Sequence, residues 1–147
     1  SKCQFAFNVL QSVEAYAIHE KFIDKRMDAY DPQVMSRILR ARKWTPADIS
    51  KANLYKNKIT NWFNDFFETY DFLVMPISPT ASVPLKDANS SLREMTLQLT
   101  TPASLSGLPA LTVPVWLDEK RSIGLQFIFK KVEPKIPLAI VELCKNI

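Results

Sequence analysis

The chain has 147 residues, a formal net charge of +4, and 47% hydrophobic against 23% charged residues; this length and balance are typical of a globular protein that is one domain or a piece of one. Its longest apolar runs are far shorter than the roughly 20 residues that a membrane-spanning helix needs, and the N-terminus shows no secretion signal, so we expect a soluble, cytoplasmic protein. Only two glycines, Gly107 and Gly124, occur beside ten prolines, which excludes a glycine-rich phosphate loop, a dinucleotide fingerprint and a glycine-rich oxyanion loop.

Residues 1–70 are predicted to be helical. The first helix spans residues 5–29, with an apolar stripe made by Val13, Tyr16, Ala17 and Phe22. Asp31 and Pro32 mark a new start, because aspartate is a favoured N-cap and proline fits the first helical turn. The second helix carries three apolar residues before Trp44 closes it: Val34, Ile38 and Ala41.

The third helix is expected to begin at Thr45, whose spacing from Asp48 is close to that of a capping box. From there apolar side chains recur at steps of three and four, which indicates an amphipathic helix of roughly 25 residues. These side chains are Ile49, Ala52, Tyr55, Ile59, Trp62, Phe63, Phe66 and Tyr70. An aromatic face of this size must pack on a large partner surface, most simply a sheet.

Residues 71–130 are predicted to form a strand, a helix and a hairpin. The apolar run at residues 72–77 indicates a strand buried on both faces, of the parallel type. Ser91 opens a helix that we expect to end near Leu99. Residues 111–117 and 123–130 form an antiparallel hairpin, with Pro114 on an edge or at a kink because it cannot donate a ladder bond. A closing helix at about residues 137–145 completes an α/β fold.

Few residues are candidates for catalysis. His19 is the only histidine; no second histidine completes a zinc motif, so we assign it a structural role. The pair Ser90 and Ser91 has no flanking glycines and is explained by a helix cap. The carboxylates Asp24, Asp28 and Asp31 do not supply four ligands, so we expect no metal and no cofactor.

Two further features have a plain structural explanation. Cys3 and Cys144 stand at opposite ends of the chain, and we expect reduced thiols rather than a disulfide, which would require the termini to meet. A basic cluster raises the question of nucleic-acid binding, but its arginines alternate with apolar residues as on the solvated side of an amphipathic helix. The cluster consists of Arg37, Arg40, Arg42 and Lys43.

Five sequence stretches between about Glu14 and Phe129 carry a family resemblance. Residues 100–115 read TTPASLSGLPALTVPV and residues 124–129 read GLQFIF; upstream, residues 14–22 read EAYAIHEKF, residues 30–52 read YDPQVMSRILRARKWTPADISKA, and residues 70–84 read YDFLVMPISPTASVP. Together they resemble the C-terminal part of the amidase-signature hydrolases. The resemblance implies the C-terminal portion of that family's mixed-sheet fold, with helices packed on a sheet and a terminal β-hairpin. Residues 1–147 would then belong to a single domain, divided into helical 1–70, strand, helix and hairpin 71–130, and closing helix 131–147.

The resemblance also implies an activity, the hydrolysis of an amide C–N bond to a carboxylate and ammonia or an amine. Family members use a serine, a second serine in a cis peptide and a lysine, all in the N-terminal part of the fold, and no stretch here matches that machinery. The chain is therefore expected to be inactive alone and to partner the remaining N-terminal part of the domain. The substrate of the parent enzyme would be a small amide.

Leu97 and Thr101 are the candidate substrate-binding residues. They are four residues apart and share a helix face, and in proteins that the chain resembles this helix forms a wall of the channel to the nucleophile. The alternative is that Leu97 is a core residue and Thr101 ends the helix before Pro102. Ser104 departs from the asparagine that is usual in the family.

Two other functions stay open. The chain could be a noncatalytic, truncated relative that acts as a binding or scaffold module, burying the aromatic face of its long helix against another protein. A basic nucleic-acid-binding domain is the less favoured third reading, because only nonspecific charge supports it.

Overall fold

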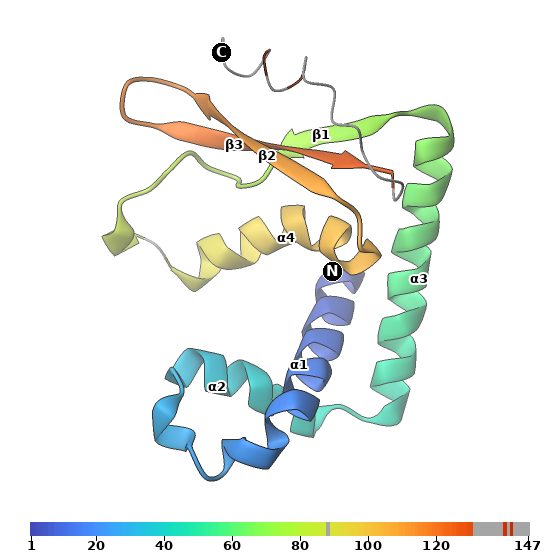
Figure 1. Ribbon diagram of the computed structural model, residues 1–147, viewed down its shortest axis with the longest axis vertical. Helices are drawn as coiled ribbons and strands as arrows, with labels where there is room; N and C mark the ends of the chain where they lie inside the picture. Colours follow the sequence, from blue (N-terminus) through green and yellow to red (C-terminus); the bar gives the residue numbers. More distant parts are fainter. Residues whose placement is uncertain (88, 131–139, 141, 143–147) are drawn as a thin grey trace. The chain divides into compact units, whose positions relative to one another are not determined.

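The protein is a mixed α/β structure in the computed structural model, which describes residues 1–87, 89–130, 140 and 142 (Figure 1). It has helices α1 (Lys2–Ile23), α2 (Pro32–Leu39), α3 (Pro46–Thr69) and α4 (Ser90–Ser106) and strands β1 (Phe72–Pro76), β2 (Ala110–Trp116) and β3 (Ser122–Phe129). Short 3-10 helices occupy Met27–Ala29, Arg40–Lys43 and Leu85–Asp87. Most of the closing helix predicted at 137–145 lies outside the described residues, of which 140 and 142 are helical, and Cys144 lies outside them as well. The chain divides into two compact units, Ser1–Lys58 and Ile59–Ile147.

The first unit is helical, as predicted. Its first helix begins earlier and ends earlier than predicted. The hydroxyl of Ser1 accepts the amide of Gln4 and starts α1 at Lys2, and the helix ends at Ile23 rather than at residue 29. The predicted stripe is not the buried face, because Phe22 is 54% exposed. The buried residues of α1 are instead Ala6, Val9, Ser12 and Ile23.

Local capping signals are confirmed in this unit. The carboxylate of Asp31 accepts the amides of Gln33 and Val34 at 2.9 and 3.1 Å and begins α2. Thr45 and Asp48 form the reciprocal capping box at the start of α3: the amide of Asp48 donates to the Thr45 hydroxyl at 3.2 Å, and the amide of Thr45 donates to the Asp48 carboxylate at 3.0 Å. Each cap satisfies helix amides that have no partner within the helix.

The second unit is built around the aromatic half of α3. Phe63 and Phe67 are buried in one cluster with Ala103 of α4 and Ile128 of β3. Trp62, on the flank of the same helix, stays 54% exposed. The predicted packing of this aromatic face on a sheet is therefore confirmed for part of the face only.

The sheet of this unit is antiparallel throughout its described strands, in the order β1-β3-β2. The predicted hairpin of β2 and β3 is confirmed, and Pro114 lies on the outer strand β2 opposite Gly124. The prediction for β1 is wrong: it pairs antiparallel with β3, and its residues alternate between exposed and half-buried. A continuous apolar run does not distinguish a doubly buried strand from one with a partly covered face, and the strand's partner lies about fifty residues away.

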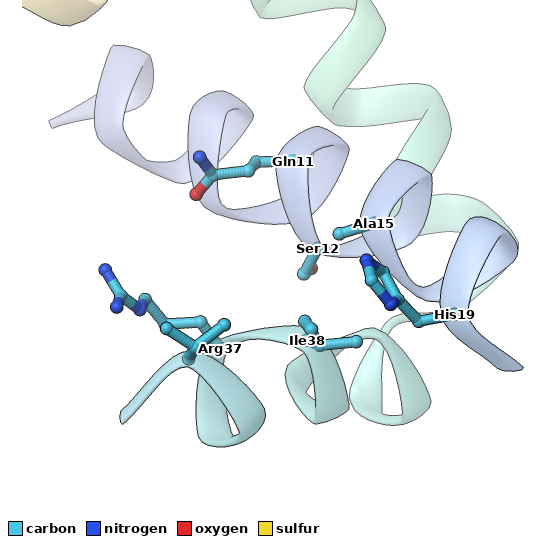
Figure 2. Close-up of a pocket in the computed structure, with 7 residues that line it drawn as sticks. Gln11, Ser12, Ala15, His19, Arg37 and Ile38 are labelled. Atoms are coloured by element: carbon cyan, nitrogen blue, oxygen red, sulfur yellow. The ribbon is translucent and has the colours of Figure 1, made fainter. Parts of the chain in front are cut away.

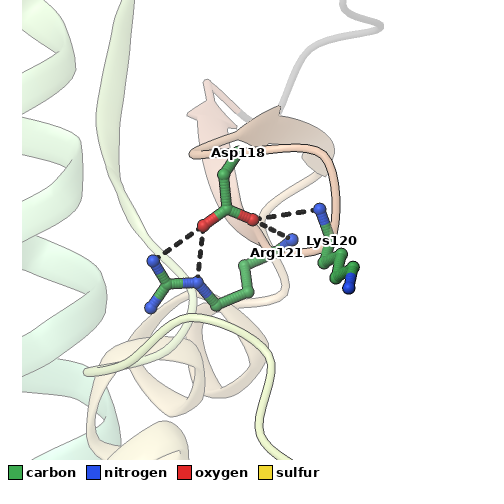
Figure 3. Close-up of polar contacts among 3 residues, drawn as sticks. All are labelled: Asp118, Lys120 and Arg121. Atoms are coloured by element: carbon green, nitrogen blue, oxygen red, sulfur yellow. Dashed lines mark hydrogen bonds and ion pairs between the residues drawn. The ribbon is translucent and has the colours of Figure 1, made fainter.

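The turn between β2 and β3 is organised by one carboxylate. Asp118 accepts the amides of Lys120 and Arg121 at 3.0 and 2.8 Å, and the Arg121 side chain binds its other oxygen at 2.7 Å (Figure 3). The hydrogen bond from the Lys120 amide, followed by that from the Arg121 guanidinium, lowers the pKa of Asp118. This network closes the hairpin that carries β3 back to the centre of the sheet. Among the described helices none combines the length and apolarity needed to cross a membrane.

Candidate functional site

The helix that carries both candidate substrate-binding residues, α4, differs from its prediction at both ends. Its N-cap is Asn89, whose side chain accepts the amide of Leu92 at 2.9 Å, instead of Ser91. It continues through Pro102 to Ser106, beyond the expected end near Leu99. Proline lacks the amide hydrogen that would bond to Gln98, which weakens the helix without ending it here.

Gly107 terminates α4 as a left-handed C-cap. Its φ of 64° is in the left-handed region, which glycine adopts without steric cost. The amide of the next residue, Leu108, bonds back to the Ala103 carbonyl at 3.1 Å. The turn leads directly through Pro109 into β2 and so ties the end of α4 to the sheet.

Thr101 and Leu97 occupy different environments on the same helix. Thr101 is only 1% exposed, and its hydroxyl has no hydrogen-bond partner. Leu97 is half-buried. The alternative in which Thr101 ends the helix is wrong, because α4 runs five residues past it. Their contact with a substrate stays a prediction.

Three other hydroxyls of α4 donate to carbonyls of the helix itself. Thr96 donates to the Leu92 carbonyl at 2.9 Å, Thr100 to the Thr96 carbonyl at 3.2 Å, and Ser104 to the Thr100 carbonyl at 3.4 Å. Thr101 thus differs from these three residues, because its buried hydroxyl donates no hydrogen bond to the helix. Ser106 is the other residue of α4 with such a hydroxyl among the described residues.

Two residues of β3, Gly124 and Gln126, make close contacts with other parts of the second unit. Gly124 lies where a Cβ would come within 2.5 Å of the Ile77 side chain, so the absent side chain permits a close approach. Gln126 is 3% exposed, and its amide nitrogen donates to the Leu99 carbonyl at 3.1 Å. Sequence reasoning missed Gln126 as an individual residue, although a lone amide inside the apolar run LQFIF was a signal.

His19 is engaged by a neighbouring side chain in the first unit. Its Nδ1 lies 2.8 Å from the Tyr30 hydroxyl, and the two rings meet edge to face. This contact is consistent with the structural role predicted for His19. Of the carboxylates weighed as ligands, Asp31 caps α2 and Asp24 pairs with Arg42 at 3.1 Å. The described residues contain no group of three or more metal-binding side chains.

A pocket of about 330 Å³ lies beside His19, between α1 and α2 (Figure 2). Its lining combines apolar and hydrogen-bonding groups. The Ser12 hydroxyl in this lining is already bonded to Trp44 at 2.9 Å. The residues that line it are Gln11, Ser12, Ala15, His19, Val34, Arg37 and Ile38.

The basic cluster of the first unit is divided among separate local contacts. Arg37 lines the pocket and donates to the Gln33 carbonyl at 3.0 Å. Arg42 lies against Tyr16 and Asp24, and the hydrogen bond to Tyr16, followed by that to Asp24, raises the pKa of its guanidinium. Two of the four basic side chains therefore have protein partners, which adds no support to nucleic-acid binding.

Comparison with known proteins places this geometry in one family. The family model named Amidase matches residues 4–133. A glutamyl-tRNA(Gln) amidotransferase subunit from Staphylococcus haemolyticus is 33% identical over 131 residues, covering 84% of this chain and 27% of the relative. The chain thus spans about a quarter of the length of the curated relatives it matches.

Solved structures agree with this match. A crystal structure of an amidase superposes with a TM-score of 0.76 at 27% identity, over 86% of this chain and 31% of that chain. A bacterial aryl acylamidase of the amidase signature family superposes with a TM-score of 0.68 at 17% identity, over 89% of this chain and 31% of that chain, which shows a shared fold. The described helices and antiparallel sheet thus have counterparts in larger amidases.

Proposed function

The chain belongs to the amidase family, and from this premise we propose that it is the C-terminal part of an amide hydrolase. In this proposal it completes the sheet and one wall of the substrate pocket, and the remaining N-terminal part of the domain supplies the serine, second serine and lysine. The joined enzyme cleaves an amide C–N bond of a small amide to a carboxylate and ammonia or an amine. The match of the family model to residues 4–133 is the observation that carries the proposal.

The chemistry of amide hydrolysis explains why we assign the catalytic residues to the N-terminal part of the domain and the pocket wall to this chain. An activated nucleophile and donors for the developing oxyanion must meet at one carbonyl group. His19, the histidine of the chain, is bound to Tyr30, and the hydroxyls of α4 at Thr96, Thr100 and Ser104 are bonded to their own helix. Because these side chains are already hydrogen-bonded within the protein, we assign them a structural role. We therefore expect the chain alone to be inactive.

Leu97 and Thr101 are the wall residues in this proposal. Leu97 offers a half-buried apolar surface, and Thr101 offers a buried hydroxyl with no partner in the protein. A pocket that combines apolar surface with a few polar groups is the usual form of a small-molecule site. These two residues would therefore affect which amide is accepted more than how fast it is cleaved.

A cytoplasmic location is part of the same proposal, and cell fractionation tests it.

The test compares the 147-residue chain alone with the same chain joined to the part that carries the serine and lysine residues. We expect release of ammonia or amine from small amides in the joined protein and none from the chain alone. Hydrolysis by the chain alone, retained after removal of contaminating proteins, would refute the division of labour. A joined protein that binds a protein partner but cleaves no amide would favour the noncatalytic module instead.

A further inference from the structure

Gln126 is a polar side chain in an apolar position. It lies in β3, the middle strand of the described sheet, with Met75 and Thr112 as its cross-strand neighbours, and it is 3% exposed. Removal of an amide side chain from water is costly unless its hydrogen bonds are replaced. A residue of this kind in the centre of a sheet therefore requires a specific partner.

That partner is the backbone of α4. The side-chain nitrogen of Gln126 donates to the Leu99 carbonyl at 3.1 Å, across 27 residues of sequence. Within residues 1–87 and 89–130, no other side-chain hydrogen bond joins α4 to the sheet. The hydrogen bond is directional, so it depends on the position of α4 along the sheet, whereas apolar contacts tolerate small shifts.

Both elements also contribute to the buried cluster of the second unit, one turn further along α4. Ile128, two residues after Gln126 and on the same face of β3, belongs to the buried cluster that contains Ala103, four residues after Leu99. Two strand residues advance about 6.6 Å, and four helix residues advance about 6.0 Å. The spacing from Gln126 to Ile128 along β3 is therefore close to the spacing from Leu99 to Ala103 along α4.

The hydrogen bond also acts next to a gap in the internal bonding of α4. Pro102 cannot donate to the carbonyl of Gln98, so one internal bond is missing next to Leu99. Leu99 stands midway between Leu97 and Thr101, the two wall residues of the proposed pocket. A support at Leu99 is thus a support for both.

We infer that Gln126 is a positioning residue that fixes the register of α4 against the sheet and thereby holds Leu97 and Thr101 in place. The register role stands on the geometry of β3 and α4. The consequence for substrate binding rests on the proposed function.

The first experiment measures amide hydrogen exchange in the 147-residue chain. Gln126→Met keeps a similar length and removes the donor, and Gln98→Met, at an exposed position of α4, is the matched control. Because the net contribution of one hydrogen bond is modest, we expect exchange over residues 97–105 to become about fivefold faster in Gln126→Met. We expect no change in α1 and none in the control. Unchanged exchange over residues 97–105, or equal acceleration throughout the chain, would overturn the inference.

Gln126→Glu adds a readout that general destabilisation does not reproduce. The introduced carboxyl is buried, and its cross-strand neighbours Met75 and Thr112 are not titratable, so its pKa is raised. When protonated it donates to the Leu99 carbonyl, and when ionised it repels that oxygen. Relative to the unsubstituted chain at the same pH, exchange over residues 97–105 should be near normal at pH 4 and accelerated at pH 8. A difference independent of pH would count against the hydrogen bond as the cause.

Kinetics of the joined hydrolase separate this inference from the proposed function. With register lost, Gln126→Met should raise KM for the amide severalfold and leave kcat nearly unchanged, whereas Gln98→Met should alter neither. Faster exchange with an unchanged KM would support the register role and overturn the assignment of α4 as the pocket wall.

Discussion

The unpartnered hydroxyl of Thr101 leads to a stability prediction at the scale of one residue. Thr101→Val replaces the hydroxyl with a methyl group of similar size and removes a polar atom that is buried without a hydrogen bond. We expect the free energy of unfolding to stay constant or rise by about 1 kcal/mol. Chemical denaturation measures it, with Thr100→Val as control, because that hydroxyl is bonded to Thr96 and its loss should bring no gain.

The same substitution tests the role of Thr101 in the pocket. If the hydroxyl binds substrate, Thr101→Val in the joined hydrolase should raise KM although the protein is no less stable. A clear loss of stability would contradict the first expectation, because it would mean that the hydroxyl has a partner in the folded protein.

Replacement of either glycine by alanine should destabilise the protein, but for a different reason at each position. Gly107→Ala places a side chain at a φ of 64°, with no atom within 4 Å of the new Cβ, so its cost of about 1 kcal/mol is conformational. Gly107→Asn should recover part of it, because asparagine tolerates this region. Gly124→Ala instead brings the new Cβ to 2.5 Å from the Ile77 side chain and 3.0 Å from that of Thr112, so adding Ile77→Ala should relieve most of the steric strain. Thermal unfolding of the single and double variants distinguishes the causes; relief of Gly107→Ala by Ile77→Ala would contradict this explanation.

At the scale of the element, the start of α3 should depend on pH. The hydrogen bond from the Thr45 amide, followed by that from its hydroxyl, lowers the pKa of Asp48. Its folded pKa therefore lies below the unfolded value of about 3.9. The stabilisation is present above that value and is lost as the pH falls through the folded pKa. The thermal midpoint should drop more between pH 5 and pH 2 in the unsubstituted chain than in Asp48→Ala. The pKa of Asp118 is also lowered, but this residue is present in both proteins, so its contribution to the pH dependence cancels in the comparison. Parallel curves of thermal midpoint against pH would contradict the prediction.

The elements also show how far the sequence determines the fold. The caps at Asp31 and at Thr45 with Asp48 were predictable because a cap involves residues two or three positions apart, all within one short stretch. The end of α4 was not, because Pro102 reads locally as a stop, whereas the packing of Ala103 in the buried cluster favours continuation. The direction of β1 depends on β3, about fifty residues later, and no local pattern contains that information.

The candidate site shows the same limit. The spacing of Leu97 and Thr101 on one helix face was predictable from helix geometry. The burial of Thr101 and its lack of a partner were not, because they depend on what packs against α4. Gln126 has its hydrogen-bond partner 27 residues away, so the motif GLQ indicated that the residue is unusual and gave no reason for it.

At the scale of the whole molecule, the apolar surface predicts how the chain behaves alone. Large apolar side chains stay exposed in both units, among them Ile18 at 70%, Trp62 at 54% and Trp116 at 58%. In the described sheet, β1 and β2 each have one unpaired edge, and such edges promote association. We therefore expect concentration-dependent self-association in light scattering and binding of a hydrophobic dye. Both signals should fall when the N-terminal part of the domain is joined to the chain, because that part would cover these surfaces.

Two variants identify the faces involved in association. Trp62→Gln and Trp116→Gln should each reduce the association of the chain alone. A monomeric chain that melts cooperatively and binds no dye would contradict the proposal that its sheet is completed by another part of the domain.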